Sequence, residues 1–122
     1  MKSMTASATI AAPAREIFDV IADLEQHSSF AADELEVRRL TGEGSGATYE
    51  SRAVARGRTF DAASTVITKQ PPEHFGFRAE DVSGTFRHRK DVTATNNGCR
   101  VTRTVTPVHL PPGQPALYWL VL

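Results

Sequence analysis

The 122-residue sequence is poor in cysteine, and its single cysteine, Cys99, excludes an internal disulfide framework. Its formal net charge is zero, from 14 basic and 14 acidic residues, which argues against attraction of the whole molecule to nucleic acid or to an acidic membrane. The apolar runs are far shorter than a membrane span, and residues 1–12 lack the apolar core of a signal peptide. We therefore expect a reduced, cytoplasmic protein without a membrane span.

Residues that hold metals and cofactors are also few and poorly spaced. The four histidines form neither an HxH nor an HExxH arrangement: His27, His74, His88 and His109. The sequence contains no glycine-rich phosphate loop, no nucleophile elbow and no Ser-His-Asp order. We therefore expect neither a metal site nor a cofactor.

Clusters of glycine, proline and asparagine divide most of the sequence into short segments. These turn signals lie at residues 42–46, 56–57, 70–74, 82–84 and 96–98, and the pair Asn97-Gly98 is typical of a tight hairpin turn. The segments that they separate are rich in Val, Thr, Phe, Tyr and Arg: residues 33–41, 47–55, 58–69, 74–81, 85–95 and 99–107. Short turns between such segments predict an antiparallel meander.

The N-terminal part has a different pattern. Residues 4–10 predict a short strand of small residues, and residues 12–24 predict a helix with Pro13 at its first position. Ile17, Ile21 and Leu24 fall at i, i+4 and i+7, and Phe18 and Val20 are expected to widen this apolar stripe. Residues 25–30 predict a second short helix or a turn. We therefore expect one α+β domain over residues 1–122, with its helices on one side of an antiparallel sheet.

The alternation of side chains along the strands predicts two unlike faces of the sheet. One face carries arginines, threonines and acidic residues and should face solvent. The other face is mostly apolar, but it also holds His88, Lys90 and Arg103, which need partners, water or a ligand if they point inward. The candidate ligand-binding residues on this second face are Tyr49, Phe60, Phe75, Phe77, Phe86, His88, Lys90, Val101 and Arg103.

Three stretches together resemble a known superfamily: "ATIAAPAREIFDVIADLEQHSSF", the "PPE" turn at residues 71–73, and "GCRVTRTVTP" in the last strand. Their order and spacing are similar to those of the START-related SRPBCC superfamily. This birch-pollen-allergen-like group includes polyketide cyclase/dehydrase and lipid-transport proteins. The resemblance implies a helix-grip fold, in which a curved seven-stranded antiparallel sheet grips a long C-terminal helix and two short helices follow the first strand. It also implies a cavity that binds hydrophobic small molecules.

The end of the chain departs from this pattern. "PPGQPALYWLVL" resembles only the start of the long helix, with Tyr118 as a further candidate ligand-binding residue. We expect this C-terminal helix to be truncated here. Either the natural chain continues beyond Leu122 or a second molecule completes the lid, for instance in a homodimer that covers the apolar C-terminal segment.

Three functions fit these patterns. The first is a module that binds a hydrophobic small molecule, lipid-like or aromatic and polyketide-like, between the sheet and the C-terminal helix. The second is an enzyme of the polyketide cyclase/dehydratase type, in which His88 moves protons at a pKa near neutral and Arg103 or Lys90 stabilises an enolate. The third is a regulatory protein whose apolar end docks on a partner. We favour the first. We expect no nucleic-acid binding, because alternation places Arg87 and Arg89 on the opposite face from the other basic residues of their strand.

Each candidate residue also has an ordinary structural interpretation. Lys90 and Arg103 could extend to the rim of the sheet, or the assignment of faces could be shifted by one residue. Tyr49 and Tyr118 could simply pack in the core. Cys99 follows a turn and has no activating base near it in the sequence, so we expect an inert thiol.

Overall fold

The computed structural model describes residues 3–25, 34–55, 57–81 and 84–110. In chain order, the elements are β1 (Met4–Ile10), α1 (Ala14–Ala22), β2 (Glu34–Thr41), β3 (Thr48–Ala55), β4 (Arg58–Gln70), β5 (His74–Asp81), β6 (Gly84–Thr95) and β7 (Gly98–His109). Each strand begins and ends within a few residues of the segment that the turn signals predict.

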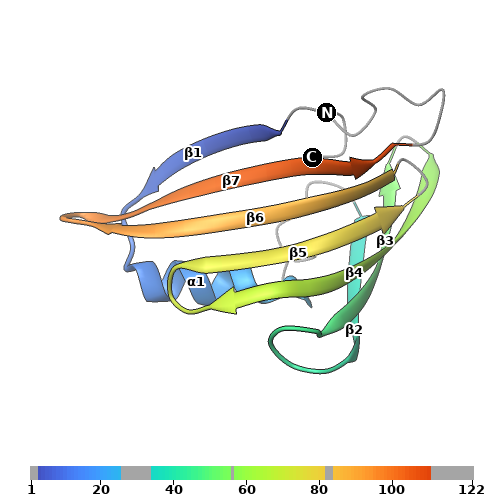
Figure 1. Ribbon diagram of the computed structural model, residues 1–122, viewed down its shortest axis with the longest axis horizontal. Helices are drawn as coiled ribbons and strands as arrows, with labels where there is room; N and C mark the ends of the chain where they lie inside the picture. The colour runs from blue at the N-terminus through green and yellow to red at the C-terminus, as the bar shows by residue number, and fades with distance from the viewer. Residues whose placement is uncertain (1–2, 26–33, 56, 82–83, 111–122) are drawn as a thin grey trace.

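All seven strands form one antiparallel sheet in the order β1-β7-β6-β5-β4-β3-β2. Figure 1 shows β5, β6 and β7 running side by side along the long axis, whereas β2 and β3 turn across it, so that the sheet is curved. The predicted α+β class and the curved seven-stranded sheet are therefore confirmed, and they fit the helix-grip fold. The described part contains the first of the two predicted short helices. Residues 26–30 of the second, and the whole of the predicted C-terminal helix with Tyr118, lie outside the described residues.

The tight turn between β6 and β7 depends on Gly98. This residue has a φ of 154°, a conformation that L side chains rarely adopt. A Cβ atom at this position would also collide with the backbone carbonyl oxygen of Ile10, at the end of β1. The glycine therefore permits both the hairpin turn and the close approach of the first strand to the last.

Helix α1 begins directly after Pro13, whose carbonyl accepts a hydrogen bond from the Ile17 amide at 3.1 Å. Proline thus lies one position before the helix rather than at its first position. Phe18 is fully buried and meets Phe75 of β5 edge to face, with ring centroids 6.5 Å apart. The expectation that Val20 widens the buried stripe is wrong, because Val20 is 40% exposed. Side chains two residues apart in a helix point in nearly opposite directions, so Val20 points away from the buried Phe18.

We define the inner face of the sheet as the face that α1 covers, and the outer face as the opposite one. The helix contacts β5, β6 and β7 (Figure 1). At this end of the inner face lies the main core cluster: Phe18, Ala22, Leu24, Ala47, Val66, Phe75, Val92 and Cys99. A second, smaller cluster joins Phe86 and Val105 to Met4 and Leu110.

Candidate functional site

The strand register brings most of the candidate residues onto the inner face. On neighbouring strands, Phe75 lies opposite Lys90, Phe77 opposite His88, and Lys90 opposite Arg103. Side chains two residues apart along a strand share a face, so Phe86 and Val101 lie on this face as well. Phe77 and Val101 pack against the cluster beneath α1, and Phe86 belongs to the smaller cluster. The alternative assignment, shifted by one residue, does not agree with this register.

The candidates differ in how deeply they are buried. Phe75 and Phe86 are almost fully buried, at 1% and 4% exposure, and serve as packing residues of the two clusters. Phe77, His88, Lys90, Val101 and Arg103 are half-buried. Val101 lies beside Val92 of the main cluster, whereas the other four continue from that cluster toward the smaller one, where the inner face keeps part of its surface accessible.

The imidazole of His88 stacks on the ring of Phe77. The ring centroids are 4.6 Å apart and the planes differ by only 4°. Burial lowers the pKa of His88 from 6.5 to about 4, helped by the positive charges of Lys90 and Arg103 and only partly opposed by Asp81. At neutral pH the ring is therefore uncharged.

Two basic residues, Lys90 on β6 and Arg103 on β7, lie directly opposite each other. Burial, and next the charge of Arg103, lower the pKa of Lys90 below its ordinary value. On its other side Lys90 faces Phe75, and Arg103 faces Ala6 of β1. The two basic groups thus lie within a largely apolar surface.

The two remaining candidates on the sheet lie toward its other edge. Tyr49 is half-buried on β3, opposite Ser64 and Arg39, and packs against the main cluster. Burial raises the pKa of its hydroxyl group. The backbone of Phe60 pairs with Ala53, and its side chain is outside what the structure describes.

Sequence reasoning missed a polar network on the outer face, near the start of β5. His74 Nδ1 lies 2.6 Å from Asp91 Oδ1, and Arg89 Nε donates to the same oxygen at 2.9 Å. Burial raises the pKa of Asp91, but these two hydrogen bonds outweigh it and leave the pKa below its ordinary value. The contact pairs residues that the register places opposite each other, so only the hairpin alignment of β5 and β6 could have revealed it.

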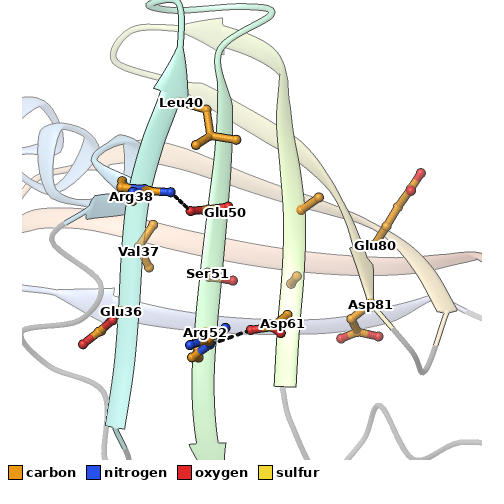
Figure 2. A pocket seen from close by; sticks show the side chains of 12 residues that line it. Glu36, Val37, Arg38, Leu40, Glu50, Ser51, Arg52, Asp61, Glu80 and Asp81 are labelled. Atoms are coloured by element: carbon orange, nitrogen blue, oxygen red, sulfur yellow. Dashed lines mark hydrogen bonds and ion pairs between the residues drawn. The ribbon is translucent and has the colours of Figure 1, made fainter. Parts of the chain in front are cut away.

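A large open hollow of about 970 Å³ lies over β2, β3, β4 and β5 (Figure 2). Its lining is mainly charged, and the ion pairs Arg38–Glu50 and Arg52–Asp61 lie within it. This hollow does not match the predicted apolar cavity, which would lie on the inner face beneath residues 111–122. That cavity stays a prediction.

Within the described ranges, no group of three His, Cys, Asp or Glu side chains is arranged to hold a metal ion. Among those same residues, no helix is long and apolar enough to cross a membrane. Cys99 is a free thiol buried in the main cluster.

Solved structures share this fold. The protein TTHA0849 from Thermus thermophilus superposes with a TM-score of 0.77 at 20% identity, over 98% of this chain and 84% of that one. Ara h 8.0201 gives 0.78 at 12% identity, over 98% and 86%. Protein CV1439 from Chromobacterium violaceum gives 0.75 at 13% identity, over 98% and 91%.

At these identities the structural likeness shows the fold alone. By sequence, no curated protein matches the chain. Residues 1–118 do match the family described as polyketide cyclase / dehydrase and lipid transport. The chain therefore belongs to this family, within the SRPBCC superfamily that its sequence resembles.

Proposed function

We propose that this protein binds a hydrophobic small molecule, lipid-like or aromatic, on the inner face of its sheet. Folds of this superfamily typically bind hydrophobic ligands. The observation that carries the proposal is the half-buried surface at the margin of the main cluster, where the stacked rings of Phe77 and His88 lie next to Lys90. Partly covered aromatic and aliphatic side chains around a few polar groups are typical of ligand sites.

Helix α1 supports this placement because it covers the sheet at one end only. Its buried residues, Phe18 and Ala22, pack with Phe75, Val92 and Cys99. Phe77 lies at the margin of that cluster and, together with His88, continues the inner face toward Phe86. In our proposal the ligand lies there, between the sheet and the C-terminal segment that we expect to be helical.

The enzyme hypothesis is less favoured. The register does place His88 and Arg103 on the same face, as a shared site requires. A general base works best when its pKa is close to the working pH, whereas the pKa of His88 is about 4. A neutral imidazole stacked on Phe77 is better suited to contacting a ligand than to moving protons.

Partner binding and cellular location are two further proposals. A homodimer, or docking on a partner, would use the apolar segment near Tyr118, outside the described residues. A cytoplasmic location is supported by the buried, unpaired thiol of Cys99. Both remain proposals.

Native mass spectrometry of freshly purified protein tests the proposed function. We expect an added mass that organic extraction releases as a hydrophobic compound. His88→Trp should fill the site beside Phe77 and remove this mass. The control is Ile67→Trp, because Ile67 is 45% exposed on the outer face, beside Arg87 and Arg89, and its replacement should leave binding unchanged. Apo protein that also fails to bind the neutral probe N-phenyl-1-naphthylamine would overturn the proposal.

A further inference from the structure

The inner face is mostly apolar, yet it carries two basic side chains next to each other. Lys90 and Arg103 occupy directly opposed positions on β6 and β7. Such residues have Cβ atoms about 4.5–5.5 Å apart, and like charges at this position destabilise a sheet. The row continues with Phe75 next to Lys90 and Ala6 next to Arg103.

Among the described residues, Lys90 has no ion pair, and burial, together with the charge of Arg103, lowers its pKa. Its neighbour along the strand, His88, is uncharged at neutral pH. Within the part of the chain that the structure describes, the acidic group that acts on His88 is Asp81, at the far end of β5. A charged lysine placed this way is costly unless an anion binds beside it.

The residues around Lys90 and Arg103 indicate the chemistry of the rest of the ligand, beyond its anionic group. Apolar surface adjoins the pair on both sides, with Val101 toward the cluster beneath α1 and Phe77 and Val105 toward the smaller cluster. An anion with a full hydration shell would bind poorly against such a surface. An anion attached to an apolar body would bury that body and place its negative charge beside Lys90 at the same time.

We propose that the inner-face site selects an amphiphilic monocarboxylate, with its carboxylate between Lys90 and Arg103 and its apolar part along the stacked rings of Phe77 and His88. The arginine fork suits two parallel hydrogen bonds to a carboxylate, and the lysine adds a second positive charge. This inference rests on the proposed function, because it specifies the chemical class of ligand for the same surface.

The experiment compares laurate with lauramide, which keeps the chain and the shape but has no charge. Both compounds displace the neutral fluorescent probe N-phenyl-1-naphthylamine from the full chain, and the ratio of their dissociation constants is the readout. We expect laurate to bind about tenfold more tightly, corresponding to one charge-assisted contact of roughly 1.4 kcal/mol. In Lys90→Gln this preference should fall to about twofold or less.

Arg87→Gln is the matched control. Arg87 is exposed on the outer face of the same strand, and its replacement removes the same net charge. The laurate preference should therefore survive in this variant. Retained probe binding and an unchanged circular dichroism spectrum show that Lys90→Gln is folded, and Lys90→Met provides a second variant without the charge.

The outcomes separate the two proposals. Equal binding of laurate and lauramide, with the probe still bound, overturns the carboxylate proposal and leaves hydrophobic binding in place. A laurate preference that survives in Lys90→Gln overturns the role of Lys90. A protein that binds neither compound nor the probe contradicts the proposed function itself.

Discussion

Replacing His88 with phenylalanine should make the protein less sensitive to acid. Phenylalanine keeps a ring to stack on Phe77 but cannot take up a proton. In the wild-type protein the pKa of His88 is lowered from 6.5 to about 4. As the pH falls from the first value toward the second, the unfolded chain binds a proton that the folded chain excludes, so the free energy of unfolding decreases.

The size of the effect follows from the shift. At about 1.4 kcal/mol per pKa unit, the full shift corresponds to roughly 3 kcal/mol once the pH is below both values. His88 is only half-buried, and water near it weakens the effect. We therefore expect a loss of about 1–2 kcal/mol between neutral pH and about pH 5 that the variant does not show.

Urea denaturation followed by circular dichroism, at both pH values and on both proteins, measures this difference. Other groups such as Asp91 titrate equally in the two proteins, so their contributions cancel. An NMR titration of the imidazole gives the pKa directly. Equal acid sensitivity of wild type and variant, or a His88 titration midpoint near 6.5, would refute the reasoning.

Three further changes test the packing. Phe18→Ala should lower the free energy of unfolding by about 3–5 kcal/mol, because a fully buried ring is removed from the main cluster; a loss below about 1 kcal/mol in urea denaturation would contradict this. Gly98→Ala should cost more than about 2 kcal/mol, since its Cβ would strike the Ile10 carbonyl, and an unchanged melting temperature would be inconsistent with this turn. Lys90→Met should leave stability unchanged or raise it by about 1 kcal/mol, because it removes a charge opposite Arg103; a clear loss in the ligand-free protein would show that the pair is stabilising.

Most of the sheet could be predicted from the sequence because turn chemistry is local. Asn97-Gly98 marks the β6–β7 hairpin, and once the turn is fixed, alternation assigns every side chain of the two strands to a face. The amino-acid pattern alone therefore places Lys90 and Arg103 on one surface.

The sequence is less informative where the alternation of side chains is interrupted or where an interaction depends on the strand register. The segment around Val66 does not alternate cleanly, and the structure shows why: a register shift between Val66 and Thr68 inserts an extra residue opposite β5. The low pKa of His88 was also missed, because it depends on burial and on charges that only the register brings together. The network of His74 with Asp91 has the same origin.

The central claim is that a hydrophobic ligand binds on the inner face of the sheet. Intermolecular NOEs between bound laurate and the protein test it most directly. We predict NOEs from the alkyl chain to the rings of Phe77 and His88, and none to Ile67 on the outer face. NOEs to Ile67 without any to Phe77 or His88 would contradict the account.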